Sequence, residues 1–179
     1  HESWFNAPWV DMLKVKASIG SQGNDNIDNY LYTDTYEVTN SDGEVGVTFV
    51  SKGNEDITWE TNTNINAGVD FEFFKRRLNG SVEFFYRKTS DMLFFFTVPT
   101  SLGYDGYYAN IGDMRNRGIE FSLDGDIIRS KNVVWSANLN ATHYTNKILR
   151  LPDERKTVTL EGYEGYASST YFYGEGLPL

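Results

Sequence analysis

Most of the chain alternates between apolar and polar side chains, with the period of two that a half-buried β-strand requires. The clearest run covers residues 59–73, where one parity is mostly apolar and the other carries acids, asparagines and one glycine. Four more runs repeat the pattern at residues 13–20, 78–87, 119–127 and 135–142. Helical spacing is nowhere comparable. The pattern therefore predicts an all-β antiparallel meander whose strands have one apolar and one polar face.

The lengths of the strands and of their connections favour a membrane barrel. The run at 59–73 is much longer than the roughly 5 or 6 residues usual in soluble strands. Tight turns at 74–77 and 129–132 alternate with long stretches at 22–57, 91–114 and 146–169. Outer-membrane barrels have this organisation, with short periplasmic turns, long extracellular loops, an apolar face toward lipid and a polar face toward the lumen. The parity predicts these lipid contacts: Val69, Phe84, Phe121 and Leu139.

Two other classes of protein fit the same alternation. One is a soluble β-sandwich that binds carbohydrate or mediates adhesion, in which the apolar face meets a second sheet. The other is a β-rich glycosidase, with Glu60 and Glu120, or Asp124 and Asp126, as its acid and base. Carboxylates lining a barrel lumen are the simpler interpretation of these acids. The apolar parity discriminates the barrel from the sandwich, because a barrel leaves it without a protein layer across it.

Charge and composition limit the partners. The 179 residues include 16 Lys and Arg against 25 Asp and Glu, a net charge of −9, which argues against nucleic acid as a partner. Both tight turns are basic, whereas the long loops are mostly acidic. The absence of Cys removes disulfides and zinc–thiolate sites. No apolar run approaches the roughly 20 residues of a transmembrane helix, whereas a barrel strand needs only about 10.

The most distinctive candidate for ligand contact is an aromatic loop. Tyrosine rings beside amide and carboxylate groups suit the recognition of a sugar or a peptide, and the alternatives are loop packing or an interfacial aromatic girdle. The predicted ligand-binding residues are Tyr104, Asp105, Tyr107, Tyr108 and Asn110.

Catalysis and metal binding are not predicted. His143 falls on the apolar parity near a strand end, where an interfacial or packed imidazole is a simpler interpretation than a catalytic one. Residues 24–29 offer oxygen ligands but lack the full calcium-binding pattern of an EF-hand. With no phosphate-cradling loop and no nucleophile motif, the sequence predicts neither an enzyme nor a metal or other cofactor.

Five short motifs follow one another along the chain. They are WVDMLKVKASIG at 9–20, followed by Gly23-Asn24, then GNEDITWE at 53–60, LNGSVEFFYRKTSDML at 78–93, ANIGDMRNRGIE at 109–120 and NKI at 146–148. In this order they resemble the motifs of SusC/RagA-type TonB-dependent transporters, over about residues 4–176. In two positions of the second motif the chain departs from the family, with Glu55 in place of the usual Pro and Thr58 in place of the usual Lys.

The resemblance implies a barrel of about 22 strands with a plugged lumen in a Gram-negative outer membrane, to which this chain contributes about six strands. It also implies import of oligosaccharides or peptides, energy supplied through TonB, and a SusD-like surface lipoprotein as a lid. Residues 1–179 are then expected to be part of the barrel domain, without the plug, the TonB-contacting region or the closing C-terminal strands. The resemblance does not indicate which substrate is carried.

Overall fold

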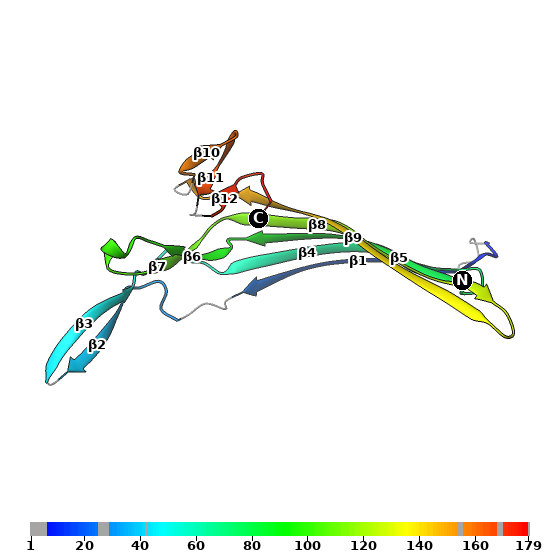
Figure 1. Ribbon diagram of the computed structural model, residues 1–179, viewed down its shortest axis with the longest axis horizontal. Coiled ribbons are helices and arrows are strands. Elements are labelled where there is room, and N and C mark those ends of the chain that lie inside the picture. The colour runs from blue at the N-terminus through cyan, green and yellow to red at the C-terminus, as the bar shows by residue number, and fades with distance from the viewer. Residues whose placement is uncertain (1–6, 25–28, 42, 154–155, 168–169, 179) are drawn as a thin grey trace. The chain divides into compact units, whose positions relative to one another are not determined.

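The computed structural model describes residues 7–24, 29–41, 43–153, 156–167 and 170–178 (Figure 1). Within these ranges the chain forms β-strands joined by turns and loops, with one short 3-10 helix at Thr100–Leu102 and no α-helix. No helix in the described ranges is long and apolar enough to cross a membrane. The all-β prediction is therefore confirmed.

The chain divides into two compact units. The first, called the strand unit, comprises residues 1–21, 63–88 and 115–146. The second, called the loop unit, comprises residues 22–62, 89–114 and 147–179.

Each of the five predicted runs forms one long strand of a single sheet. Their order in the sheet, β1-β4-β5-β8-β9, follows their order in the sequence, as a meander requires. The sheet has five strands where the resemblance implied about six. The strands are β1 (Val10–Asn24), β4 (Glu60–Phe73), β5 (Leu78–Ser90), β8 (Asp113–Arg129) and β9 (Val134–Arg150).

Two tight turns join neighbouring strands of the strand unit, where the sequence predicted them. Residues 74–77 link β4 to β5, and the Arg77 amide donates to the Phe74 carbonyl at 3.3 Å. Between β8 and β9, the Ser130 amide donates to the Val133 carbonyl at 2.9 Å, and the Val133 amide donates to Ser130 Oγ at 3.1 Å. Both connections reverse the chain direction, so the paired strands are antiparallel.

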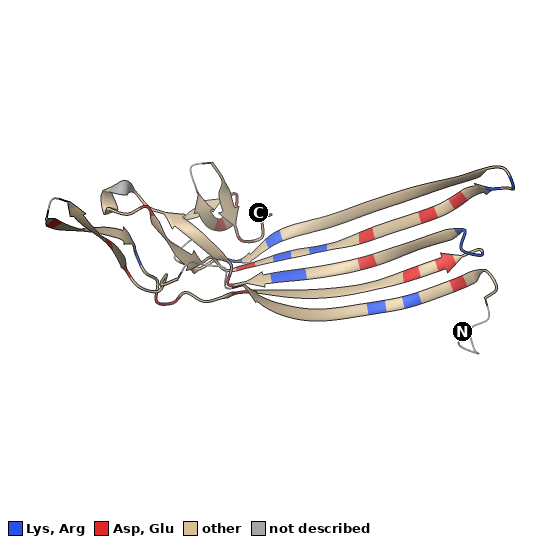
Figure 2. Cartoon of the chain, turned by 90° about the horizontal axis from the view of Figure 1, so that it is seen from below, with Lys and Arg blue, Asp and Glu red and all other residues tan. Residues whose placement is uncertain are grey.

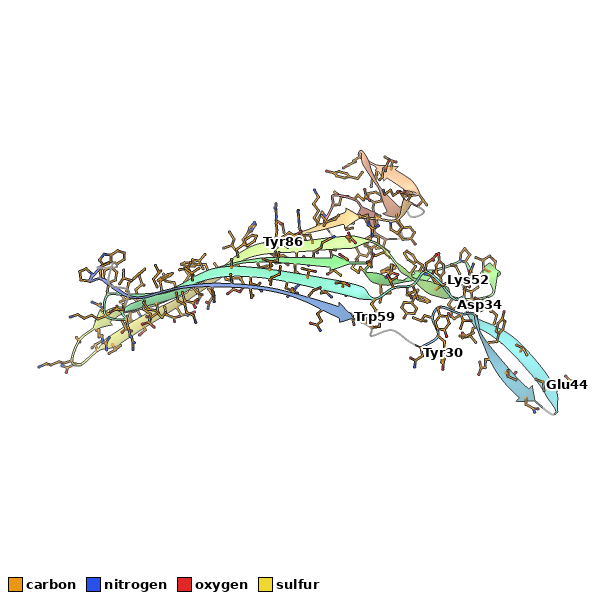
Figure 3. The ribbon with its side chains drawn as sticks, turned by 180° about the vertical axis from the view of Figure 1, so that it is seen from behind. Tyr30, Asp34, Glu44, Lys52, Trp59 and Tyr86 are labelled. Carbon is orange, nitrogen blue, oxygen red and sulfur yellow. The ribbon has the colours of Figure 1, made fainter. Side chains whose placement is uncertain are left out.

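The apolar parity of the strand unit has no covering layer within that unit. Val15 is 76% exposed, Ile19 77% and Leu139 56%, although all three are apolar. In the described part of the strand unit there is one sheet and no second one, and Figure 3 shows side chains projecting from both sides of the strands. A soluble sandwich would require such a second sheet, so the single layer favours the barrel.

The polar parity of the strand unit carries cross-strand ion pairs and hydrogen bonds. Lys16 of β1 lies 3.0 Å from Asp70 of β4 and 2.9 Å from Glu83 of β5. Arg87 Nε donates to Asn64 Oδ1 at 2.8 Å. Figure 2 shows basic and acidic bands spread along the strands. Because these groups are partly exposed, they contribute more to pairing register than to net stability.

The loop unit is more ordered than the sequence pattern indicated. Where the sequence shows only long polar or aromatic connections, the structure has two hairpins and a small three-stranded sheet. The hairpins are β2 (Thr35–Ser41) with β3 (Glu44–Ser51), and β6 (Leu93–Thr97) with β7 (Gly106–Asn110). The small sheet comprises β10 (Val158–Leu160), β11 (Tyr163–Ala167) and β12 (Phe172–Gly174).

The buried apolar side chains among the described residues are few and belong to the loop unit. Phe96, Ile148 and Leu151 are each 5% exposed or less. Burial in this chain therefore holds the loops together, whereas the long strands keep most of their apolar side chains on the surface.

Candidate functional site

The base of the candidate site is built around Gly53 and Asn54, which follow β3. A Cβ on Gly53 would collide with the backbone of Thr33, so only glycine allows this close approach. Asn54 then donates through Nδ2 to the Tyr108 carbonyl at 3.1 Å. Its Oδ1 accepts from the Asp56 amide at 3.1 Å. The Gly-Asn pair of the second motif thus joins the end of β3 to β7.

Asn110 makes a second connection within the loop unit. Its Oδ1 accepts from the Thr58 amide at 2.9 Å, and its Nδ2 donates to the Thr58 carbonyl at 3.0 Å. The same Nδ2 donates to the Asp91 carbonyl at 2.6 Å. The amide of Asn110 therefore satisfies backbone groups from two loops that are distant in sequence.

A hollow of about 500 Å³ lies beside these connections. Tyr104 and Tyr107 contribute aromatic surface to it, and Lys52, Asp56 and Asn110 contribute charged and amide groups. An aromatic face beside hydrogen-bonding groups is the combination that binds a sugar ring or a peptide segment. Lys52 and Asp34, labelled in Figure 3, flank Gly53, whose amide donates to Asp34 Oδ1 at 2.8 Å.

Aromatic contacts hold the tyrosines of this hollow. The ring of Tyr104 packs edge-on against Phe49 with centroids 5.3 Å apart, and Tyr107 lies 5.9 Å from Phe96. Because hairpin β6–β7 pairs Phe96 with Tyr107 directly, the position of Tyr107 is set by strand register.

The five predicted ligand-binding residues thus separate into groups. Tyr104, Tyr107 and Asn110 line the hollow. The ring of Tyr108 packs against Phe95, with centroids 5.1 Å apart, and Asp105 is exposed just before β7, where its carbonyl accepts from the Val98 amide at 3.0 Å. Ligand binding by all five remains a prediction. Lys52, Asn54 and Asp56 line the same hollow and were missed, because no local pattern shows that the 53–60 motif meets the aromatic loop.

A second hollow of about 380 Å³ in the loop unit has a different chemistry. Its walls are almost wholly apolar and include Phe96, Ile148 and Leu151. Asp113 and Arg150 also line it, and Arg150 Nη2 lies 3.5 Å from Asp113 Oδ1. A sugar bound here would leave most of its hydroxyls unpaired, so the first hollow suits a polar ligand better.

Glu175 and Lys156 form a charged pair, called here the clamp, that holds the chain after β9. Glu175 Oε1 accepts from the Leu151 amide at 2.8 Å and lies 3.1 Å from Lys156 Nζ. The Leu151 hydrogen bond, followed by the nearby Lys156, lowers the pKa of Glu175. Hydrogen bonds to Asp153 and Glu175 raise the pKa of Lys156 in turn. Each shift favours the charged form that the clamp uses.

The residues considered for catalysis or metal binding have structural surroundings. Glu60 belongs to the loop unit and accepts from Asn62 Nδ2 at 3.0 Å, whereas Glu120 belongs to the strand unit. Asp124 accepts from Asn138 Nδ2 at 2.7 Å, and His143 is exposed. Of the stretch at 24–29, residues 25–28 lie outside the described ranges. Within those ranges, no three His, Asp or Glu side chains are grouped to hold a metal ion.

Comparison with protein families decides the class. The family model described as "TonB dependent receptor-like, beta-barrel" matches residues 5–178. This chain belongs to that family. The family resemblance read from the five motifs is therefore confirmed. The family is one of outer-membrane transporters and receptors rather than enzymes.

Named relatives of the family are similar along most of this chain. "TonB-dependent receptor P39" of Formosa agariphila is 31% identical over 175 residues, which are 96% of this chain and 16% of the relative. "TonB-dependent receptor SusC" of Bacteroides thetaiotaomicron is 33% identical over 148 residues, 78% of this chain and 15% of the relative. The chain thus spans less than a fifth of the length of these receptors.

Solved structures agree with this family assignment. The chain superposes on "Structure of the RagAB peptide transporter" with a TM-score of 0.76 and 30% identity. The match covers 90% of this chain and 18% of that one. The RagAB peptide importer in its "open-open" state gives the same TM-score at 28% identity and covers 97% of this chain. The fold of this chain therefore matches one part of a RagAB transporter chain.

Proposed function

We propose that this chain forms part of the outer-membrane barrel of an importer of oligosaccharides or peptides. The observation that carries the proposal is the uncovered apolar face of a single-layer sheet, because in water such an exposed apolar face would promote aggregation. In a bilayer the same face contacts hydrocarbon, and the polar parity, with its Lys16, Asp70 and Glu83 cluster, lines the lumen.

In this proposal the protein works with a SusD-like surface lipoprotein and takes energy from the TonB complex. The names of relatives support the idea, since one is SusC and a matching structure is the RagAB peptide importer. The barrel would have about 22 strands, with its plug and TonB-contacting region outside residues 1–179. The turns at 74–77 and 130–133 would face the periplasm, and the loop unit the exterior.

The polar hollow of the loop unit is the proposed substrate contact. Tyr104 and Tyr107 would stack on the substrate, and Asp105 and Tyr108 would contact it at the edge. Asn110 has an additional role, because its side chain already holds the backbone of Thr58 and Asp91.

Uptake of labelled substrate by cells that depend on this receptor tests the proposal. Replacing both Tyr104 and Tyr107 with Ala is expected to lower the apparent affinity about 10- to 100-fold, at roughly 1 kcal/mol per stacked ring. Tyr32→Ala is the matched control, because Tyr32 is 56% exposed and outside the hollow. Candidate glycans and peptides are tested separately.

Two results would contradict the proposal. Uptake that persists after the proton-motive force is collapsed would argue against a TonB-driven importer. Equal uptake by the double variant and the parent would remove the polar hollow as the substrate contact, and would leave the barrel assignment intact.

A further inference from the structure

The two tight turns of the strand unit lie next to each other at one end of the sheet. The Asp126 amide donates to the Arg77 carbonyl at 2.8 Å, which connects the first turn to β8 just before the second turn. The Arg77 guanidinium donates to the carbonyls of Asp126 at 3.1 Å and Ile127 at 3.4 Å. The two turns therefore form one continuous edge, called here the turn rim (residues 74–77 and 129–133).

The turn rim carries basic side chains, some of which have partners and some of which do not. Arg76 pairs with Glu72 at 3.0 Å, and Arg129 lies 3.6 Å from Asp126. Lys75 and Lys131 are exposed and have no ion pair within the described part of the chain. Two free ammonium groups, next to two guanidinium groups that are still largely exposed, create a local cationic edge on a chain of net charge −9.

The backbone of the first turn does not explain its basic residues. Phe74, Lys75 and Arg76 have φ values of 58°, 58° and 61°, all in the left-handed region. Gly or Asn would adopt this conformation at lower cost than Phe, Lys or Arg. The backbone conformation therefore does not account for Lys75, whereas Arg76 pairs with Glu72 and the Phe74 ring packs against Trp9.

An apolar collar lies directly beside the charges. The ring of Trp9 lies 5.1 Å from that of Phe73 and 6.2 Å from that of Phe74, centroid to centroid. Beside the second turn, Val133 is 55% exposed and Val134 64%. Cationic tips next to exposed aromatic and aliphatic groups match the boundary between lipid headgroups and acyl chains. A soluble anionic partner would meet the charges but leave the hydrocarbon collar in water.

We infer that the turn rim binds the phosphate headgroups of anionic phospholipids, with Lys75 and Lys131 as the main contacts. The inference rests on the proposed function for its orientation, since periplasmic turns would face the phospholipid leaflet of the outer membrane. The bound lipids fix the height of the barrel in the membrane, while the collar lies at the top of the acyl chains.

Spin-labelled lipids in bilayers containing the purified intact receptor test the inference. The measured quantity is the preference of protein-associated lipid for phosphatidylglycerol over phosphatidylcholine. Lys75→Asn with Lys131→Gln is the test variant, because Asn suits the left-handed backbone of residue 75. Its preference is expected to fall up to about five-fold for each lysine removed, and raised salt is expected to weaken that of the parent.

Matched variants distinguish an effect of charge on the lipid preference from an effect of misfolding. Lys14→Gln with Lys147→Gln removes the same charge from exposed sites away from both the turn rim and the polar hollow, and is expected to keep the parental preference. Lys75→Arg with Lys131→Arg keeps the charge and is expected to keep the preference as well. Heat-modifiable gel migration confirms that each variant is folded.

Three outcomes would overturn the inference. One is an unchanged preference in the folded test variant, and another is loss of the preference when inorganic phosphate is added at constant ionic strength. The third is selective binding of lipopolysaccharide through the same lysines, which would place the turn rim on the outer leaflet. If the preference disappears while uptake persists, only this inference fails, whereas absent uptake with an intact preference contradicts the proposed function alone.

Discussion

Two arginine variants, one on each face of β9, test most directly which face of the sheet contacts lipid and which lines the lumen. Leu139 is 56% exposed on the apolar parity, and Asn140 follows it on the polar parity at almost the same depth. We expect Leu139→Arg to destabilise the membrane-inserted protein strongly and Asn140→Arg only slightly, because only the first would place a cation in hydrocarbon.

The size of the effect follows from the depth of Leu139. Leu139 lies six residues after Val133, the last residue of the turn. This is about 20 Å along a strand that rises about 3.3 Å per residue. With a tilt of about 40°, this is about 15 Å in depth, near the middle of an apolar band about 25 Å tall. Arg at the midplane of a barrel's lipid face costs about 2–4 kcal/mol. That cost corresponds to a roughly 30- to 700-fold change in the folding equilibrium.

The control variant, Asn140→Arg, is expected to lower the free energy of unfolding by a smaller amount. Asn140 Nδ2 donates to Asn138 Oδ1 at 2.7 Å, and losing this exposed hydrogen bond costs about 1 kcal/mol or less. The assay is guanidinium unfolding of the receptor in phosphatidylcholine vesicles, with the folded fraction measured by gel mobility. Equal destabilisation by both variants would refute the assignment of faces, and a larger effect of Asn140→Arg would reverse it.

Three other predictions concern packing, pH and loop order. Gly80→Ala is expected to lower the free energy of unfolding by about 1–3 kcal/mol, since its Cβ would lie 2.6 Å from a phenylalanine ring and from a backbone carbonyl. Gly20→Ala, with nothing within 4 Å, is the control in the same unfolding assay. Because the folded pKa of Glu175 is lowered, its clamp is present at neutral pH and lost as the pH falls through that folded value. Amide exchange at Leu151 is expected to accelerate there, and Glu175→Gln is expected to raise the neutral-pH rate and remove the pH step. Asn110→Ala is expected to expose the aromatic loop to added protease, and unchanged cleavage kinetics would contradict its role in holding that loop.

The two faces of the sheet and the positions of its tight turns could be predicted from the sequence. Strand alternation is local geometry, since successive side chains point to opposite faces whatever the rest of the chain does. The run at 59–73 therefore indicated β4 with an error of one residue at its start. The basic turn at 74–77 was visible for the same reason, because it interrupts the alternation between two such runs.

The architecture of the loop unit was decided only by tertiary structure. Asn54 meets the carbonyl of Tyr108 across 54 positions, and Thr58 meets Asn110 across 52. No period of two or 3.6 encodes such contacts, so the pattern indicated long loops where the chain forms hairpins. The Gly53-Asn54 motif contributed to the family resemblance, but the sequence did not show why glycine is needed at residue 53. The structure shows the reason, which is the close approach of the Gly53 backbone to Thr33.

The sequence by itself thus determined which side chains share a face, because that property depends only on the backbone geometry of neighbouring residues. Tertiary structure decided what lies across from each face and which distant segments meet. It left the apolar side of the five-stranded sheet uncovered and brought Tyr104, Tyr107 and Lys52 around one hollow. The physical reason is that packing is a long-range property, set by segments whose encounter no local pattern records.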